Sequence, residues 1–360
     1  MMAAPQVDVL IVGGGPVGLA AAIEARLIGL SATIIEPRGG PDSADGGSGS
    51  ADGGSGSIDK ACGEGIMPGA VPALARLGVA PHGHPLRGVS YQSAGRRVDH
   101  RFRSGSGLGV RRTELSRALA GRAEELGVGR VADRVDTIEQ DGASVTAAGV
   151  TGRYLLGADG LHSTVRRLCG LEIAVPQQGR RFGLRRHYAI APWSDLIEVH
   201  WTPLAEAYVT PVSHDLVGIA LLGPARTDFD EAIASVPTLA SRLAGVAPAS
   251  TLRGAGPFDQ RATRRSFGRV MLVGDASGYV DAITGEGIRV GLAQARAAIE
   301  CIAAGRPGYY EREWMLRTRD FRVLTAGLVA VATSPLRGAI VPAAVALPRL
   351  FGGVVERLAR

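Results

Sequence analysis

Three glycines near the N-terminus are spaced so that the backbone around them can hold a phosphate group. Gly13, Gly15 and Gly18 follow the apolar, β-branched run 7–12 and precede a segment that favours a helix over 17–30. The first glycine permits a tight turn, the second lets the backbone approach a pyrophosphate, and the third lets the helix pack closely on the strand. The free N–H groups and the dipole of that helix would then face the phosphate.

An acidic residue completes this pattern at the end of the next predicted strand. The apolar run 31–35 ends at Glu36, where a carboxylate can accept hydrogen bonds from ribose hydroxyl groups. Strand, glycine turn, helix and acid together predict a dinucleotide-binding unit rather than an ordinary strand-to-helix turn. The pattern alone leaves open whether the dinucleotide is FAD or NAD(P).

Two more acid-bearing turns follow apolar strands later in the chain. Asp159 stands in Gly-Ala-Asp-Gly after a strand predicted at 154–156, and Asp275 stands in Gly-Asp-Ala after a strand predicted at 269–273. Ligands of open parallel sheets bind at the carboxyl ends of the strands, so these turns are expected to converge with Glu36 on one extended cofactor. Either aspartate alone would be explained better as a turn or cap residue. The combination with the glycine turn disfavours that explanation.

Composition limits the class of protein. With 360 residues, 46% of them apolar, the chain exceeds one typical core, so two interleaved domains are expected. The net charge of +6 comes from scattered arginines and one lysine, Lys60, which argues against a nucleic-acid groove. Cys62, Cys169 and Cys301 lie far apart without metal-ligand spacing, so we expect no metal site, no disulfides and a reducing, cytoplasmic location. The longest uncharged stretch, 323–336, is too short to span a bilayer.

A seven-residue repeat interrupts the region after Glu36. Residues 44–50 read Ala-Asp-Gly-Gly-Ser-Gly-Ser, and residues 51–57 repeat them letter for letter. This composition cannot bury a core, so a flexible Gly/Ser insertion is expected over 43–57, whether natural or engineered.

Periodicity and turn residues predict the other elements. In chain order they are a short helix over 68–77, a hairpin over 89–102, a helix from its cap Thr113 to about Leu126, two strands within 130–145, a helix over 229–243, and a helix from Gly285-Glu286-Gly287 to about Ala304.

Aromatic and histidine side chains mark a strand-rich middle region over 182–222, which predicts an antiparallel sheet inserted into the dinucleotide domain. For any single one of these side chains, a place in the sheet or the core is the simpler explanation. The candidate substrate-facing residues are His187, His200, Trp201, Tyr208 and His214.

Three motifs, taken in order, resemble one superfamily of flavoproteins. The chain resembles the FAD-dependent oxidoreductases of the aromatic hydroxylase (class A flavoprotein monooxygenase) and geranylgeranyl reductase superfamily in GGGPVG with Glu36, in GADG at 157–160 and in GDASGYVDAITGEGI at 274–288. The resemblance implies FAD as cofactor and NAD(P)H as co-substrate. It also implies an α/β fold: a Rossmann-like FAD-binding domain with a parallel sheet, an inserted and mainly antiparallel substrate domain, and a helical C-terminus. The predicted domains are 1–80, 105–175 and 255–310 for FAD, 81–104 and 176–254 for the substrate, and 311–360 for the helical segment.

The resemblance also implies roles for individual residues. The glycines of the first turn would seat the FAD pyrophosphate, Glu36 would hold the adenosine ribose, and Arg112 would lie near the phosphates. Asp159 would stand between FAD and the nicotinamide dinucleotide, and Asp275 would bind the ribityl chain. The backbone at 285–288 would face the isoalloxazine, where a helix N-terminus stabilises a reduced, anionic flavin and the acid within it is expected to point away. The predicted cofactor set is Gly13, Gly15, Pro16, Gly18, Glu36, Arg38, Arg112, Asp159, Asp275, Gly285, Gly287 and Ile288.

Three functions stay open at this stage. The leading hypothesis is an FAD-dependent monooxygenase that uses NAD(P)H and oxygen to hydroxylate a phenolic or polyketide-type hydrophobic molecule. However, Gly278 and the run 281–284 stand where many hydroxylases carry a histidine and a proline, and 60–65 is closer to the isoprenoid reductases. The alternative is therefore an FAD-dependent reductase that saturates isoprenoid double bonds, with an apolar C-terminus that can line a tunnel or rest on a membrane surface. A flavin-binding protein without catalysis is the third, and halogenases are disfavoured because no paired-tryptophan motif occurs and Lys60 is the only lysine.

Overall fold

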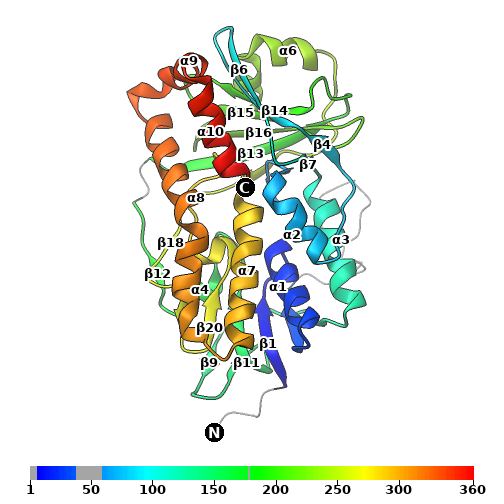
Figure 1. Cartoon of the computed structure of the whole chain (residues 1–360), viewed down its shortest axis with the longest axis vertical. Helices are drawn as coiled ribbons and strands as arrows, with labels where there is room; N and C mark the ends of the chain where they lie inside the picture. Colours follow the sequence, from blue (N-terminus) through cyan, green and yellow to red (C-terminus); the bar gives the residue numbers. More distant parts are fainter. Residues whose placement is uncertain (1–5, 38–58, 177–178) are drawn as a thin grey trace.

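The computed structural model describes residues 6–37, 59–176 and 179–360. In Figure 1 a mainly parallel sheet forms one half of the molecule and an antiparallel sheet forms the other, and helix α8 (Tyr310–Ala332) runs beside both. The predicted Gly/Ser insertion at 43–57 and Arg38 lie outside the described residues. The predicted fold class is confirmed.

β1 (Val7–Val12) lies at the centre of the parallel sheet. It pairs in parallel with β2 (Ala32–Ile35) on one side and with β11 (Val150–Gly157) on the other. β8 (Gly129–Val131) and β20 (Val270–Leu272) extend the parallel order at the two sides. Every residue of β2 and β20 is buried, as expected for parallel strands covered on both faces. The carboxyl ends of these strands therefore lie at one edge of the sheet.

Helices and short strands complete this half. α1 (Pro16–Leu27), α3 (Arg112–Glu125) and α7 (Gly287–Ala303) bury one shared apolar cluster against the sheet. A Cβ on Gly291 would lie 2.4 Å from Val17 Cγ2, so glycine allows α7 to approach α1 this closely. Short antiparallel strands flank the sheet: β9 (Glu139–Gln140), β10 (Val145–Ala147) and β19 (Ser266–Phe267).

The second half is built on a seven-stranded sheet that is antiparallel except where β14 pairs with β5. Its strands in spatial order are β17 (Arg253–Ala255), β13 (Arg181–Tyr188), β16 (Val217–Pro224), β15 (Glu206–Pro211), β14 (Leu196–Trp201), β5 (Gly88–Ser93) and β6 (Arg96–Arg101). A small sheet of β3 (Gly65–Ile66), β7 (Gly107–Gly109) and β4 (His84–Leu86) lies beside it. The pair β12 (Glu172–Ile173) and β18 (Arg261–Ala262) lies beside the parallel-sheet half, where Ala262 joins the apolar cluster of Leu272. We keep the predicted domain boundaries as a proposal.

The two faces of the seven-stranded sheet carry different side chains. Five residues define what we call the inner face, which contacts the parallel-sheet half: Arg181, Arg185, His187, Glu206 and Tyr208. The outer face carries an apolar cluster that packs against α5 (Phe229–Ala234) and α6 (Pro237–Leu243).

The C-terminal segment is helical, as predicted. After α8, the chain continues through a 3-10 turn (Pro335–Ala339), α9 (Ile340–Ala346) and α10 (Pro348–Ala359). Across the described residues no single helix is long and apolar enough to cross a membrane. Residues 307–332 and 335–346 together would have the length and apolar composition of such a helix, but they meet at an angle of 100°.

Three local predictions are corrected. Thr113 does not cap α3, which begins one residue earlier with Arg111 at the N-cap and no side-chain cap bond. The helix predicted over 229–243 is divided into α5 and α6, because Pro237 has no N–H to continue the first helix. The helix predicted over 68–77 is a 3-10 turn followed by α2: Pro68–Ala70 and Val71–Arg76.

Candidate active site

The turns that follow β1 and β11 meet at one edge of the parallel sheet. Val12 lies opposite both Ile35 and Gly157, so the segments that follow these residues start side by side. A Cβ on Gly13 would lie 2.6 Å from the carbonyl oxygen of Ala158, and Gly13 has a φ of +108°. Glycine is therefore required at this position both by space and by backbone conformation.

Glu36 and the second and third glycines complete the first turn. Glu36 Oε2 accepts a hydrogen bond of 2.9 Å from the N–H of Gly14. A Cβ on Gly18 would lie 1.9 Å from the carbonyl oxygen of Gly13, so the start of α1 depends on this glycine. Above Gly15 the nearest atom to an added Cβ is Arg112 Nη2, at 3.8 Å. Backbone N–H groups and an arginine thus face the same space.

Positive charge gathers around Asp275, which follows β20 in a 3-10 turn (Gly274–Ser277). Burial raises the pKa of Asp275, and the charges of Arg112, Lys60 and Arg166 oppose that effect without cancelling it. Within the described chain, Arg112 Nε is buried and has no hydrogen-bond partner. The site therefore combines the Asp275 carboxylate with the guanidinium group of Arg112, whose Nε can donate a further hydrogen bond.

Asp159 has a structural role that the sequence analysis disfavoured. Its Oδ1 accepts a hydrogen bond of 2.6 Å from Ser163 Oγ, and its Oδ2 accepts one of 3.0 Å from the N–H of Val165. Both carboxylate oxygens therefore support the start of α4 (Thr164–Leu168). Contact of Asp159 with a dinucleotide stays a prediction.

Two residues that sequence reasoning missed hold these turns in place. Arg166 is fully buried and donates to the carbonyl oxygens of Leu161 and Ala276, at 3.0 and 3.1 Å. Gln294 of α7 accepts a hydrogen bond of 2.6 Å from the N–H of Gly274. The Ser-Thr-Val-Arg run, which follows Gly-Ala-Asp-Gly after two intervening residues, was the available signal for Arg166. No local signal marks Gln294, because its partner lies twenty residues earlier.

The N-terminus of α7 is held by an unusual acid. Glu286 is 1% exposed and forms an ion pair with Arg289, one turn further along the helix. Burial raises the pKa of Glu286 to about 7, although Arg289 acts to lower it. No side chain among the described residues caps α7, so its first N–H groups stay available for a ligand. Gly285, with a φ of +69°, forms the turn that leads into the helix.

A buried hydrogen-bonded group joins the two halves of the molecule. Glu64 Oε1 accepts a bond of 2.9 Å from the N–H of Arg112, and Glu64 Oε2 lies 2.5 Å from His187 Nε2. Glu64 has a φ of +57°, an uncommon conformation for a residue with a side chain. Gly218 leaves room for the pair, since an added Cβ would stand 3.1 Å from Glu64 Oε2.

The partners of His187 indicate which of its ring nitrogens accepts a hydrogen bond. Arg185 Nη1 lies 3.0 Å from His187 Nδ1, and a guanidinium can only donate, so Nδ1 must accept. The proton of a neutral imidazole then sits on Nε2 and points at Glu64. Ser250 Oγ, 2.9 Å from Nδ1, completes the surroundings of the ring. Glu64 and His187 are separated by more than a hundred positions in the chain, so no local sequence signal marks their contact.

Further ion pairs connect the inner face to the loop before α7. Arg181 donates to Asp281 Oδ2 at 2.9 Å and to Glu206 Oε2 at 2.5 Å. Tyr208 donates its hydroxyl to the carbonyl oxygen of Ile283 at 2.8 Å, and burial raises the pKa of Tyr208 well above its ordinary value. This tyrosine is therefore a neutral donor that fixes the loop.

The five substrate-facing candidates do not all lie together. His187 and Tyr208 lie on the inner face, and Trp201 belongs to the apolar cluster that also contains Ile283. His200 does not lie with them: its Nε2 is 3.2 Å from Glu198 Oε2 on the outer face. His214 lies in the turn before β16 with 93% of its side chain exposed. The structure therefore does not bring the last two together with the inner-face candidates, and contact of any of the five with a substrate stays a prediction.

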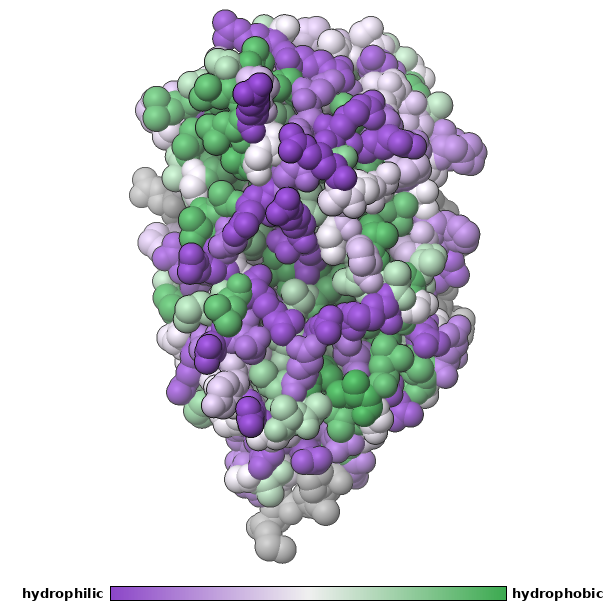
Figure 2. Space-filling view, in the orientation of Figure 1, coloured by the Kyte–Doolittle hydropathy of each residue, from purple (hydrophilic) through white to green (hydrophobic). Residues whose placement is uncertain are grey.

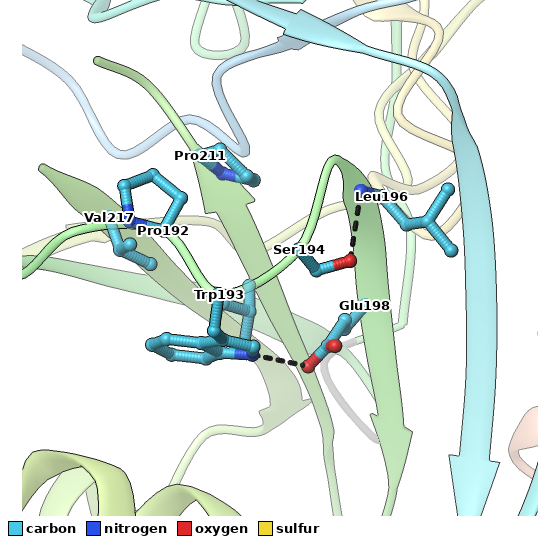
Figure 3. A pocket seen from close by; sticks show the side chains of 8 residues that line it. Pro192, Trp193, Ser194, Leu196, Glu198, Pro211 and Val217 are labelled. Carbon is cyan, nitrogen blue, oxygen red and sulfur yellow. Dashed lines mark hydrogen bonds between the residues drawn. The ribbon is translucent and has the colours of Figure 1, made fainter. Parts of the chain in front are cut away.

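Figure 3 shows the hollow on the outer face near Glu198. Trp193 Nε1 donates to Glu198 Oε2 at 3.1 Å, and Leu196 N donates to Ser194 Oγ at 3.1 Å. Burial acts to raise the pKa of Glu198, but the hydrogen bonds from His200 and Trp193 outweigh it and lower the pKa. The polar groups of this hollow are satisfied by one another, in contrast to Arg112 Nε.

Comparison with known proteins decides the family. The FAD binding domain family matches the chain over residues 6–309. The chain belongs to this family. FAD is thus its cofactor, as the three motifs predicted. The residues present fit that cofactor, because the glycine turn, the unpartnered Arg112 Nε and the uncapped start of α7 supply donors for its phosphates and its flavin.

Three similar proteins place this FAD-binding chain more closely. A 12-dehydrotetracycline 5-monooxygenase/anhydrotetracycline 6-monooxygenase of Streptomyces rimosus is 33% identical over 176 residues, which cover 46% of this chain and 33% of that protein. A menaquinone reductase of Mycolicibacterium smegmatis is 26% identical over 350 residues, covering 85% of this chain and 79% of the relative. The flavoprotein/dehydrogenase structure from Cytophaga hutchinsonii matches with a TM-score of 0.82 at 18% sequence identity, and the match covers 98% of this chain and 92% of the Cytophaga chain. At this identity the match shows a shared fold. The first relative is matched over a third of its length.

Proposed function

We propose that the protein is an FAD-dependent monooxygenase that hydroxylates a phenolic or polyketide-type hydrophobic molecule. In the balanced reaction, the substrate, O₂, NAD(P)H and a proton give the hydroxylated substrate, NAD(P)⁺ and water. FAD, when bound, supplies the electron transfer from NAD(P)H and the activation of oxygen. The protein supplies binding, orientation and exclusion of water. The monooxygenase relative of Streptomyces rimosus supports this choice.

The observation that carries the proposal is the combination of aromatic and polar groups at the loop before α7. The Tyr279 ring lies 5.7 Å from the Phe258 ring, and its Cε2 is 3.9 Å from the position of an added Cβ on Gly287. Ile283 in the same loop is buried in an apolar cluster, while its carbonyl accepts the hydroxyl of Tyr208. Aromatic faces next to fixed polar groups suit a phenol, which has both an apolar body and a polar end.

The residues of the chain have positioning roles in this proposal. Arg112 and the glycine turn bind the cofactor phosphates, and the N-terminus of α7 offers donors to the flavin. Burial raises the pKa of both Tyr208 and Tyr279, so both hydroxyl groups stay protonated at neutral pH. The Arg181–Asp281 pair holds the loop that presents these groups.

A second candidate is a reductase that saturates an isoprenoid double bond. The specific observation that favours it is the menaquinone reductase relative, which is matched over most of its length. The Thr-Gly-Glu-Gly-Ile run at 284–288 agrees with it. In that reaction NAD(P)H and a proton add two hydrogens to the substrate, and oxygen is not consumed.

Product analysis separates the candidates. The purified holoprotein is supplied with NADPH or NADH and, in parallel, with phenols and isoprenoid quinones, in air and without oxygen. We expect a phenolic product that gains one atom from isotopically labelled oxygen, only in air. Anaerobic gain of two hydrogens with no oxygenated product in air would overturn the proposal in favour of the reductase. Retained FAD without turnover of either class would indicate a non-catalytic flavoprotein.

A further inference from the structure

The chain from Val323 to Pro348 forms an apolar surface at the C-terminal end of the molecule. Arg337 is the one charged residue in this stretch, and it points inward. Its Nε donates to the carbonyl oxygen of Thr202 at 2.6 Å, and its Nη1 donates to Glu206 Oε1 at 2.5 Å. The charge is therefore satisfied inside the fold, and the outer side of this stretch is left without charge.

Large apolar side chains stay exposed here, and we call them the apolar ridge. Among them, Leu336 is 64% exposed, Leu347 is 55% exposed and Leu350 is 63% exposed. A contiguous exposed apolar surface marks a place of interaction. Figure 2 shows hydrophobic surface gathered at this end of the molecule beside a hydrophilic band. The ridge consists of Val323, Val331, Leu336, Val345, Leu347 and Leu350.

The shape and charge around the ridge point to one kind of partner. Residues 307–332 and 335–346, which carry most of the ridge, meet at an angle of 100°. No acidic residue occurs between Asp320 and Glu356, and Glu356 is buried against His100. α9 and α10 pack on β6, which brings a set of arginines close to the ridge. These arginines are Arg96, Arg97, Arg101, Arg103, Arg349, Arg357 and Arg360, of which Arg97, Arg101 and Arg357 form ion pairs with Asp99, Asp195 and Asp320.

We propose that the apolar ridge docks on the surface of an anionic lipid bilayer. The ridge would enter the interface between headgroups and acyl chains, and the arginines beside it would contact the anionic headgroups. A second copy of this chain would bring the same arginines together with no acid in the ridge to balance them. The proposal concerns attachment alone and does not depend on the reaction that the protein catalyses.

Vesicle co-sedimentation of the holoprotein tests the proposal. Vesicles of phosphatidylcholine mixed with phosphatidylglycerol are expected to bind the protein, and vesicles of phosphatidylcholine alone are expected to bind it more weakly, by roughly fivefold for each arginine engaged. Leu336→Glu and Leu350→Glu should each lower binding by roughly tenfold or more, because a leucine that would enter the bilayer is replaced by a charged side chain. Arg349→Gln should lower binding to the anionic vesicles and leave binding to phosphatidylcholine unchanged.

Leu316→Glu is the matched control. Leu316 is 62% exposed on α8, seven residues before Val323, the first residue of the ridge, and about 24 Å from the end of that helix at 1.5 Å per residue. This variant should bind vesicles as the unchanged protein does. FAD content and Tm, which should stay constant in all variants, verify folding. Equal binding by Leu336→Glu and the unchanged protein, or no binding to anionic vesicles, would overturn the proposal. Self-association that Leu336→Glu abolishes, without vesicle binding, would overturn it in favour of a second copy.

Discussion

The inner and outer faces of the seven-stranded sheet are both covered, but by different chemistry. On the inner face Arg181, Arg185, His187 and Glu206 are each at most 7% exposed and lie in ion pairs or hydrogen bonds. Most of the outer face is apolar: side chains such as Ile219 pack directly against α5 and α6, and the Glu198–His200 pair is a buried polar contact on that face. One sheet therefore shows two solutions to burial.

The difference teaches where this fold carries its function. Burying an ion pair costs desolvation free energy that attraction barely recovers, whereas apolar packing on the same strands has no such cost. A sheet selected for stability alone would be covered on both sides as its outer face is. We interpret the inner-face pairs as positioning devices, because their partners Asp281 and Glu64 lead directly to the α7 loop and to Arg112.

The largest expected effect is on stability, at the centre of the inner face. Glu206→Ala leaves Arg337 buried without a counter-charge and leaves Arg181 with Asp281 as its one remaining acidic partner among the described residues. We expect the free energy of unfolding to fall by about 3–5 kcal/mol, measured by urea denaturation. On the outer face, Ile219→Val serves as the comparison and should cost only about 0.5–1.5 kcal/mol. Similar losses for the two variants would remove the distinction between the faces.

The two buried histidines allow a matched test of cofactor binding. His187→Ala removes the partner of Glu64, whose other oxygen holds the backbone of Arg112 at the cofactor end. We expect the Kd for FAD to rise roughly 10–100-fold, the scale of a hydrogen bond to a charged group. His200→Ala, on the outer face, should leave this Kd unchanged. Fluorescence titration of the apoprotein with FAD measures both, and equal Kd values would contradict the positioning role.

Two buried glutamates, Glu286 and Glu198, should make stability depend on pH in opposite ways. The folded-state pKa of Glu286 is about 7, above the ordinary 4.5, so its protonated form is favoured by folding. The resulting stability is fully present below pH 4.5 and is lost as pH rises through 7. Glu286→Gln should therefore be more stable than the unchanged protein at pH 8, on the order of 1 kcal/mol, and equal to it near pH 4.5.

The pKa shift of Glu198, on the outer face, has the opposite sign to that of Glu286. Its pKa is lowered, so its contribution is present above the ordinary pKa and is lost only as pH falls through the lowered value. Glu198→Gln should consequently show no change in stability slope between pH 6 and pH 8. Thermal unfolding of Glu286→Gln and Glu198→Gln between pH 6 and pH 8 checks both predictions. If stability changed with pH in the same way in Glu286→Gln and the unchanged protein, the raised pKa of Glu286 would be refuted.

The smallest effect is expected at the candidate that lies on neither face. His214 is exposed in the turn before β16, so His214→Ala should alter the free energy of unfolding by less than about 0.5 kcal/mol. FAD content and the KM for substrate should stay the same. A change in KM would return His214 to the substrate site.

Strand alternation explains part of the mixed result for the candidates. His200 and Trp201 are adjacent in β14, so they must face opposite sides of the sheet and cannot both meet the same substrate. That restriction was readable in the sequence. Which of the two faces inward was not, because it depends on what covers each side: Trp201 packs 5.5 Å from the Tyr91 ring, while His200 joins Glu198.

The sequence by itself determined the cofactor end of this protein. The glycine turn, Glu36 and the start of α7 are local patterns whose spacing follows from the geometry of one strand, one turn and one helix. The tertiary structure alone decided how the inner face of the seven-stranded sheet meets that end. Glu64 meets His187 and Arg181 meets Asp281 across about a hundred residues or more of chain, and such pairs are set by how two sheets pack against each other rather than by any local spacing.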